Sequence, residues 1–365
     1  LNACVSASET FMNESGYTLY KSGSTPYRDL FASINLQADE VIFGRDYEAS
    51  LSVLHNVQNY ENSTTMGRPG MNKKIVNSYL MADGSRFTDK AGYETMTFDQ
   101  ECQNRDPRLA QTIRTPGYTR IGSTKKEAPN LAYTMTGYHL IKYSMTANYD
   151  EYNKSCNDIP LFRTAEVYLN FAEAKAELGT LKQADINKSI KLLRDRVGMT
   201  NLDMELANSK PDPYLMSAAT GYPNVKGANQ GVILEIRRER TIELAMEGFR
   251  YYDIMRWKEG KLFENDLLGI YVPGPGTYDL DKDGTDDVCF YVGTKPAGNV
   301  PLYLEIGEQI RLSNGESGYI ICHSLITKKW NEDRDYLYPV PISERTLSNG
   351  VITQNPGWND GLNFN

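Results

Sequence analysis

One short stretch of the sequence, YDLDKDGTDDVCFY at residues 278–291, has residue types and a spacing suited to binding a cation. Four of its five aspartates fall at positions 1, 3, 5 and 9 of a loop, and they are Asp279, Asp281, Asp283 and Asp287. Gly284 stands at position 6, where calcium loops turn so that carboxylate oxygens from odd positions converge on the ion. The backbone carbonyl of Thr285 can add a further oxygen. We therefore predict a calcium site formed by these four aspartates and Thr285.

The loop departs from the helix-loop-helix calcium motif, because position 12 is Phe290 and no helical pattern flanks it. It resembles instead the D-x-D-x-D-G-x-x-D loop, followed by three apolar residues, that joins two strands in calcium-binding propeller blades. A hairpin in which Asp-Gly only makes the turn is the alternative. Four carboxylates without a counter-ion would repel one another, which favours the metal. No base or nucleophile accompanies the loop, so we expect a structural role for the ion.

A second charged stretch, EIRRERTIELAMEGFRYYDIMRWKEG at residues 235–260, mixes arginines and glutamates with aromatic rings and so has the residue types of an active site. On a helix, however, residues three apart lie close together on one face. Glu235 with Arg238, and Arg240 with Glu243, have this spacing, so we expect their charges to pair along the helix surface. The structural interpretation of this stretch therefore comes before a catalytic one.

The overall composition argues against several classes of protein. The formal charge of −8 and the absence of a basic stripe argue against nucleic acid binding. No apolar run approaches the roughly 20 residues that cross a bilayer. The three histidines form no metal-ligand pair, and neither a G-x-S-x-G motif nor a phosphate-binding glycine loop occurs. We predict no enzyme, and a glycoside hydrolase that uses a pair among the 47 acidic residues is the least favoured alternative.

Apolar periodicity predicts a helical hairpin at about residues 161–197. Its first helix covers 161–178, where a wide apolar stripe is preceded by Asp158 as the N-cap and followed by Gly179. The second helix continues to residue 197. The hairpin is close in length to the roughly 34-residue tetratricopeptide unit, so we expect neighbouring hairpins to stack.

The charged stretch predicts another hairpin, at about residues 232–258, with Gly248 between its two helices. The region at about 261–330 is rich in glycine, proline and asparagine, and we expect a loop-rich excursion there. Strand character is limited to the short segments 40–43, 288–292 and 319–321. The expected fold is mostly α, with tetratricopeptide-like helical hairpins, long irregular loops and a few short strands.

Three motifs together resemble the SusD/RagB family of outer-membrane nutrient-binding lipoproteins from Bacteroidetes. They are RTAEVYLNFAEAKAELG at 163–179, RRERTIELAMEGFRYYDIMRW at 237–257 and YLYPVPISERTLSNGVITQNPGW at 336–358. Earlier segments fit in the same order, among them KKIVNSYLMADG, RDPRLAQTI and GYHLIKY. The resemblance covers nearly the whole length, so we expect one SusD/RagB-like domain over residues 1–365.

The resemblance implies non-catalytic binding of an oligosaccharide or polysaccharide at the extracellular face of the outer membrane. It also implies delivery of that glycan to a TonB-dependent, SusC-like transporter. In the family, the helices rich in arginine and glutamate belong to the scaffold. Capture of a peptide or protein-derived ligand by the same scaffold is the alternative, as the RagB branch of the family suggests.

The chain opens on a segment that resembles the middle of the family. Family members normally begin with a signal peptide and a lipidated cysteine. The resemblance therefore implies that an N-terminal part, including the lipid anchor that would attach the protein to the membrane, is missing from this chain. LNAC resembles a lipobox, but no apolar region precedes Cys4, so we do not expect lipidation there.

A glycan presents apolar ring faces that stack on exposed aromatic rings, and hydroxyls that bond to amide, carboxylate and guanidinium groups. Irregular loops that carry tyrosine or tryptophan are therefore the candidate ligand sites. We predict contacts from four aromatic residues and three polar neighbours, namely Tyr60, Tyr118, Tyr133, Trp330, Asn62, Arg68 and Arg120. Trp257 and Trp358 lie in family motifs, and we expect their rings to be packed.

Overall fold

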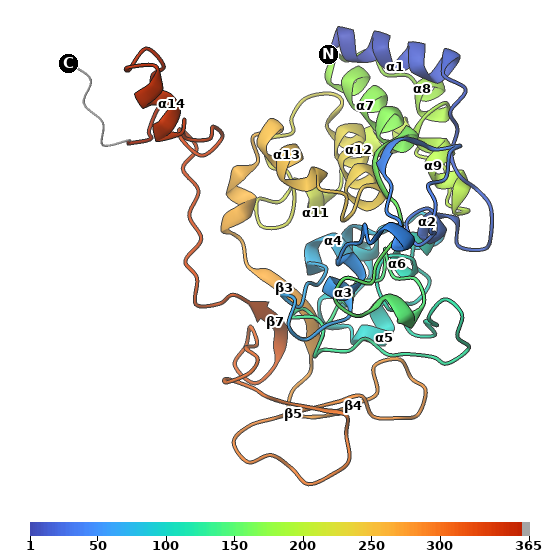
Figure 1. Ribbon diagram of the computed structural model, residues 1–365, viewed down its shortest axis with the longest axis vertical. Coiled ribbons are helices and arrows are strands. Elements are labelled where there is room, and N and C mark those ends of the chain that lie inside the picture. The colour runs from blue at the N-terminus through green and yellow to red at the C-terminus, as the bar shows by residue number, and fades with distance from the viewer. Residues whose placement is uncertain (360–365) are drawn as a thin grey trace.

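Short helices, short strands and long irregular segments alternate along the chain in the computed structural model, which describes residues 1–359 (Figure 1). The α-helices are α1 Asn2–Glu14, α2 Pro26–Asp29, α3 Val57–Glu61, α4 Lys73–Ser78, α5 Phe98–Glu101, α6 Pro107–Ala110, α7 Thr164–Glu177, α8 Gln183–Asn187, α9 Ile190–Arg196, α10 Met204–Ser209, α11 Pro213–Met216, α12 Gln230–Glu243, α13 Phe249–Arg256 and α14 Ile342–Leu347. The strands are β1 Val41–Arg45, β2 Ile159–Arg163, β3 Leu267–Val272, β4 Gly276–Tyr278, β5 Val288–Tyr291, β6 Leu302–Glu305 and β7 Gly318–Cys322. The 3₁₀ turns are η1 Ala49–Leu51, η2 Phe87–Asp89, η3 Tyr93–Thr95, η4 Ala147–Tyr149 and η5 Gly260–Glu264.

The first predicted hairpin begins with a strand rather than a helix. β2 pairs antiparallel with β1, and α7 starts only at Thr164. Asp158 does not cap this helix, because its carboxylate accepts the backbone N–H groups of Leu36 and Tyr47 at 3.2 and 2.7 Å. The prediction was wrong here because periodicity reports the side chains of one segment and not the distant strand that pairs with its backbone. Gly179 follows the end of α7 with φ of 70°, as predicted.

The second helix of this hairpin is divided into α8 and α9. Ser189 lies between them, and its hydroxyl donates to the carbonyl of Asp185 at 2.6 Å. A serine hydroxyl that bonds to the preceding turn competes with continuation of the helix. Both halves still bury the predicted apolar residues, including Ile186 and Ile190, in a core shared with α7 and α12.

The second predicted hairpin is present as α12 and α13. Gly248 separates them with φ of 85°, a conformation that glycine adopts without steric cost. α12 packs against α4, α7, α9 and α10, and every residue from Gly231 to Glu243 is buried. Figure 1 shows α12 in the middle of the helical part of the molecule, with α1 and α7 above it. α12 is therefore the central helix of the scaffold.

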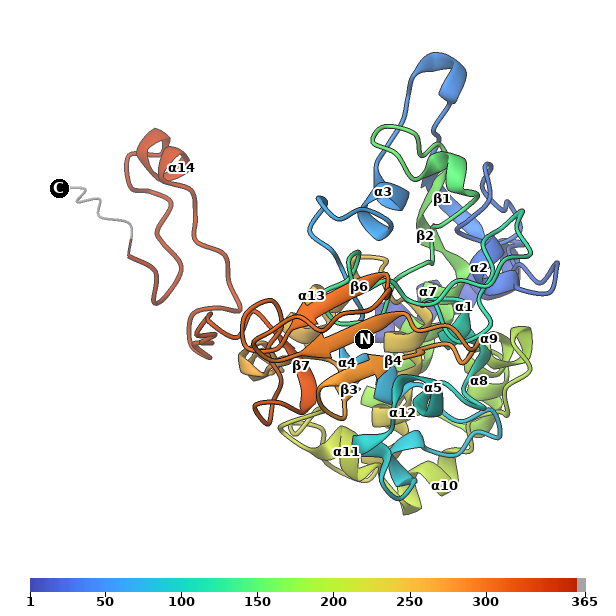
Figure 2. The same cartoon turned by 90° about the horizontal axis from the view of Figure 1, so that it is seen from below.

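The expected loop-rich excursion at 261–330 carries five strands. β3 pairs antiparallel with β7, while β5 lies between an antiparallel β4 and a parallel β6. Figure 2 shows β3, β4, β6 and β7 together on one side of the molecule. Side chains from these strands, such as Val288 and Ile320, share a core with Val76 of α4 and Ile242 of α12. Three predicted strands are confirmed as β1, β5 and β7, whereas β2, β3, β4 and β6 were not predicted.

The C-terminal segment first runs past α13 and η5, where Tyr338 contacts Tyr251 and Tyr336 contacts Gly260, and then extends away from the other elements to the turn around α14 (Figures 1 and 2). The indole N–H of Trp358 donates to the Leu337 carbonyl at 2.9 Å, so its packing is within this segment. Trp257 is buried, as predicted. Among residues 1–359, none of the helices combines the length and the apolar character needed to cross a bilayer.

Candidate functional site

The charged residues of α12 lie inside the protein and join segments that are distant in sequence. Glu243 accepts hydrogen bonds from Arg163 at 2.8 Å and Arg108 at 3.1 Å, and it also bonds to Arg196. Glu239 accepts a hydrogen bond from Arg108 at 2.5 Å. The same buried network contains Glu40, Asp106, Lys142, Arg194 and Glu247. The network therefore connects α6, α9, α12 and the β1–β2 pair.

This burial corrects the expectation that the charges pair along the helix surface. Glu235 and Arg238 do pair, at 2.9 Å, but both are buried. Arg240 bonds to Asp253 of α13 at 2.8 Å and not to Glu243. Spacing along one helix indicates which charges can meet on that helix, but the closest partners here come from other elements.

The electrostatics of the network fit a structural role. Burial by itself would raise the pKa of Glu243, but the guanidinium groups of Arg196, Arg163 and Arg108 hold that pKa well below the ordinary value of a glutamate. A catalytic acid or base needs a proton that it can exchange near the working pH. Glu243 is ionised and fully paired, so this stretch, which has the residue types of an active site, holds the scaffold together.

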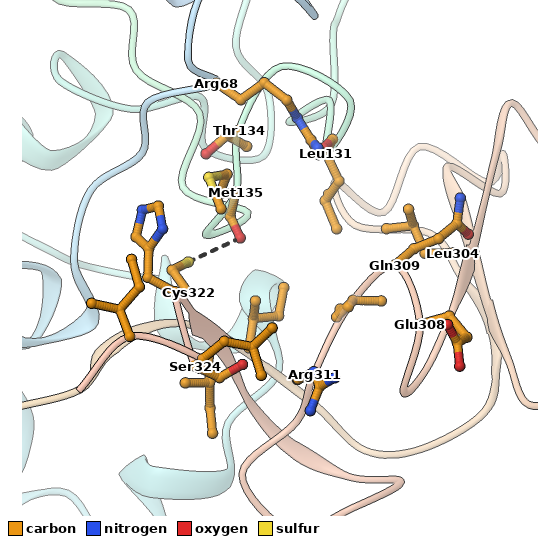
Figure 3. A pocket seen from close by; sticks show the side chains of 16 residues that line it. Arg68, Leu131, Thr134, Met135, Leu304, Glu308, Gln309, Arg311, Cys322 and Ser324 are labelled. Carbon is orange, nitrogen blue, oxygen red and sulfur yellow. Dashed lines mark hydrogen bonds between the residues drawn. The ribbon is translucent and has the colours of Figure 1, made fainter.

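A pocket of about 360 Å³ lies between the loop that carries Arg68 and the strands β6 and β7 (Figure 3). Figure 3 places Arg68 and Thr134 across the pocket from Glu308 and Gln309. The lining is mainly apolar, and its polar side chains are Arg68, Thr134, Glu308, Gln309, Arg311, His323 and Ser324. An apolar lining with a few guanidinium, amide, hydroxyl and carboxylate groups is typical of a small-molecule binding site.

The groups in this pocket are suited to binding rather than to covalent chemistry. Arg68 has φ of 50°, and its guanidinium donates to the Leu131 carbonyl at 2.6 Å. The Cys322 thiol donates to the Met135 carbonyl at 3.3 Å. Burial raises the pKa of Cys322 to about 11, so the thiol stays protonated and is a poor nucleophile.

Three of the seven predicted glycan contacts are in the interior, which corrects the expectation that they lie on exposed loops. Tyr118 is 6% exposed, and the guanidinium groups of Arg28 and Arg114 lie 5.1 and 5.2 Å from its ring centroid. Asn62 is also buried and accepts a hydrogen bond from Arg114 at 2.9 Å. Arg120 is buried and forms an ion pair with Asp150 at 2.6 Å. A glycan cannot stack on Tyr118 in this structure, because the ring face is not accessible.

The other four predicted residues are at least partly exposed. Arg68 lines the pocket of Figure 3. Tyr60 is 50% exposed and borders a second, apolar pocket of about 390 Å³. Tyr133 is half-buried, with its ring edge-on to that of His139 at 5.7 Å. Trp330 is half-buried in a group of aromatic rings beside α13. The structure therefore does not gather the seven residues into one site.

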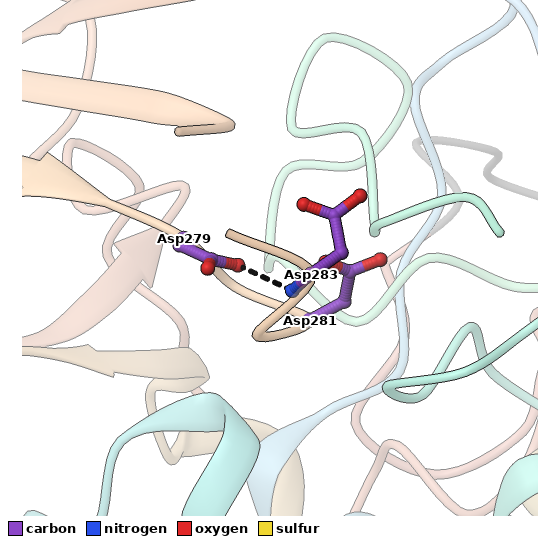
Figure 4. A group of neighbouring side chains, drawn as sticks. All are labelled: Asp279, Asp281 and Asp283. Carbon is purple, nitrogen blue, oxygen red and sulfur yellow. Dashed lines mark hydrogen bonds between the residues drawn. The ribbon is translucent and has the colours of Figure 1, made fainter. Parts of the chain in front are cut away.

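The aspartate loop joins β4 to β5, which fits the predicted strand-loop-strand arrangement. Carboxylate oxygens of Asp279, Asp281 and Asp283 lie within 4.8 Å of one another (Figure 4). Asp287 stands apart from these three, with its carboxylate accepting the N–H of Leu280 at 2.7 Å. Burial, together with the charges of the other aspartates, raises the pKa of Asp287 to about 6. This geometry suits both a tight turn and a cation site, so calcium stays a prediction.

Two of the sequence motifs noted above lie on α7, α12 and α13 of the scaffold, and the third lies on the C-terminal segment around α14. The profile of the SusD family matches residues 30–358. The chain belongs to the SusD family. This membership confirms the predicted resemblance, and it agrees with the prediction that the SusD-family protein is not an enzyme.

Solved structures show that the fold of this SusD-family chain is also shared. A SusD-like protein from Bacteroides fragilis is 20% identical, with a TM-score of 0.60 over 98% of this chain and 65% of that protein. A SusD-like carbohydrate-binding protein from the same organism is 20% identical, with a TM-score of 0.57 over 94% of this chain and 60% of that protein. The chain thus spans less than two thirds of the length of either protein. No curated protein matches the sequence.

Proposed function

We propose that this protein binds an oligosaccharide or polysaccharide at the cell surface and does not act on it chemically. Membership in the SusD family over residues 30–358 is the observation that carries this proposal. One solved protein with the same fold is a SusD-like carbohydrate-binding protein, which supports a glycan over a peptide as the ligand. In this proposal, the hairpins at 161–197 and 232–258 form a tetratricopeptide-like scaffold, and the loops around it carry the ligand site.

The proposal includes a place and a partner for the protein. It is held at the extracellular face of the outer membrane by a lipid anchor, and it passes its ligand to a TonB-dependent, SusC-like transporter. Both parts rest on the family membership. Purification of the protein from outer membranes, under conditions that keep complexes intact, should recover such a transporter with it. Recovery of the protein alone would contradict the partnership.

Glycan binding can be tested by electrophoresis in gels that contain amylopectin, xyloglucan, galactomannan or pectic galactan. We expect at least one polysaccharide to retard the protein, and we expect no increase in reducing ends when that polysaccharide is incubated with the protein. Retardation by none of them, together with binding of a peptide mixture in calorimetry, would favour the peptide alternative. Release of reducing ends would contradict the absence of catalysis.

The pocket of Figure 3 is the place where we expect Arg68 to contact the ligand. Its guanidinium can donate to sugar hydroxyls, so Arg68→Ala should weaken binding of the retarding polysaccharide by about fivefold or more. Arg45→Ala removes an exposed arginine that does not line this pocket, which makes it a matched control. Equal affinity of the two variants would show that the pocket does not take part.

We also propose that calcium binds the aspartate loop in a structural role. Three carboxylates that lie within 4.8 Å of one another repel each other unless a cation offsets their charge. Calcium should therefore raise the melting temperature of the protein, and replacement of Asp281 and Asp283 by alanine should abolish that rise. Asp286→Ala changes an exposed aspartate of the same loop that is not an expected ligand, so this variant should keep the response. A melting temperature that changes with neither calcium nor a chelator would show that the loop forms only a turn and binds no calcium.

A further inference from the structure

Six aromatic side chains from three separate segments form one group, here called the aromatic surface. Tyr251 and Tyr252 belong to α13, Phe263 belongs to η5, and the other three precede the α14 turn. Ring centroids lie 5.7 Å apart for Tyr251 and Phe263, and 5.3 Å apart for Phe263 and Trp330. Further contacts link the remaining members, namely Tyr252, Tyr336 and Tyr338. The tertiary fold therefore joins rings that are as many as 87 positions apart in sequence (338 − 251).

Polar contacts and close packing hold the rings in position. The Tyr336 hydroxyl accepts the backbone N–H of Gly260 at 2.9 Å, and the Trp330 backbone N–H donates to Glu264 at 2.8 Å. Gly260 lies directly against the indole, since a Cβ at that position would come within 2.0 Å of Trp330. Hydrogen bonding with Tyr338 raises the pKa of Tyr251 to about 12, so the phenol is neutral. A preordered group loses little conformational freedom when a ligand binds.

The aromatic surface is open to solvent on one side. Tyr252 is 63% exposed and Tyr338 is 62% exposed, whereas Trp330, Phe263 and Tyr251 are half-buried. A contiguous group of rings that is open to solvent is typical of an interaction site, whereas single exposed rings are common. None of the six residues lines the pocket of Figure 3, so this surface is a separate feature.

The chemistry around the rings favours a carbohydrate. Sugar rings have apolar faces that stack on aromatic rings, and hydroxyl edges that donate to carboxylates and phenols. Two carboxylates border the aromatic surface. Glu332 accepts a hydrogen bond from the Tyr336 hydroxyl at 2.8 Å, and Glu264 accepts one from the backbone N–H of Trp330. These acidic groups supply acceptors for the hydroxyls of a neutral polyol that stacks on the rings.

We propose that the aromatic surface is a second glycan-binding site, distinct from the Arg68 pocket, which holds a chain of several sugar units by stacking. Tyr252, Tyr251, Phe263 and Trp330 contact one another in succession, so more than one ring of this row is available to successive sugar units. This inference rests on the proposed glycan-binding function. It adds a second site, which explains how a long polysaccharide can be held at two places at once.

The test uses the whole chain and the polysaccharide that retards it among the four named above. The double variant Tyr252→Ala, Tyr338→Ala should lose about tenfold or more in affinity, because truncating stacked rings at a binding site has effects of this size. Tyr152→Ala is the control, since Tyr152 is 66% exposed and lies outside the aromatic surface. Equal melting temperatures would show that both variants are folded. The double variant should lose less affinity for a short oligosaccharide of the same sugar than for the polysaccharide.

Each outcome decides a different question. Retardation of the wild type that persists unchanged in the double variant overturns the second site and leaves the proposed function intact. Absence of retardation by any of the four polysaccharides overturns both. Loss of a transporter or another protein partner in the double variant, with polysaccharide affinity unchanged, would show that the aromatic surface binds a protein instead.

Discussion

Replacement of Glu243 by alanine should destabilise the protein by about 3–5 kcal/mol, measured by urea unfolding. The reason is that Arg163, Arg108 and Arg196 would lose a shared partner while remaining buried. An unpaired charge in the interior lacks both water and a counter-charge, so the cost exceeds that of an ordinary hydrogen bond. Because Glu243 bonds to arginines from three separate segments, we expect the whole protein to lose stability in a single cooperative transition, without local fraying.

Two further variants keep this prediction testable. Glu243→Gln retains the shape of the side chain and can still accept hydrogen bonds. It should therefore remain folded even if the alanine variant does not, and it should lose less free energy of unfolding. Glu205→Ala removes an exposed glutamate from α10, and its unfolding free energy should stay within about 0.5 kcal/mol of the wild type. A Glu243→Ala protein as stable as the Glu205→Ala protein would show that the buried network does not hold the scaffold.

A second large effect is expected for Gly231→Ala at the start of α12. In most helices this change is stabilising, because alanine has the higher helix propensity. Here a Cβ would lie 1.8 Å from the carbonyl oxygen of Ala207, which belongs to α10. Backbone atoms cannot rotate away, so α10 and α12 must separate, and the hydrogen bond of 2.8 Å from the Val232 N–H to Asn208 would be strained. We expect a loss of about 3 kcal/mol, at the upper end of the usual cost of overpacking.

Amide hydrogen exchange distinguishes this steric effect from a general loss of stability. Gly231→Ala should increase exchange in α10 more than in α7, since α10 is the element that must move. Gly227→Ala is the control, because Gly227 has φ of 95° and no neighbouring atom within 4 Å of the added Cβ. That variant should cost about 1–2 kcal/mol through the backbone alone and leave the exchange pattern of α10 unchanged. Identical patterns in the two variants would contradict the close approach of the helices.

Local sequence signals were sufficient for the elements that depend on a single segment. Apolar periodicity located α7 and α12 to within a few residues, and Gly248 marked the break before α13. The order of motifs was sufficient for the family, which the match over residues 30–358 shows. The pair of Glu235 and Arg238 was also predictable, because a helix brings together residues three apart. In each case, the atoms that interact are close in the chain.

The tertiary structure decided everything that depends on contacts between distant segments. Leu161 and Phe162 continue an apolar pattern that reads as helix, yet their backbone pairs with β1, more than 110 positions earlier (for example, 162 − 43). Tyr118 has the same residue type as Tyr252, but folding buries one ring between arginine side chains and leaves the other 63% exposed. The aromatic surface and the partners of Glu243 likewise combine residues that no spacing rule connects. Burial and long-range pairing are properties of the whole packed chain, because the free energy of each contact depends on which surfaces the other segments have already covered.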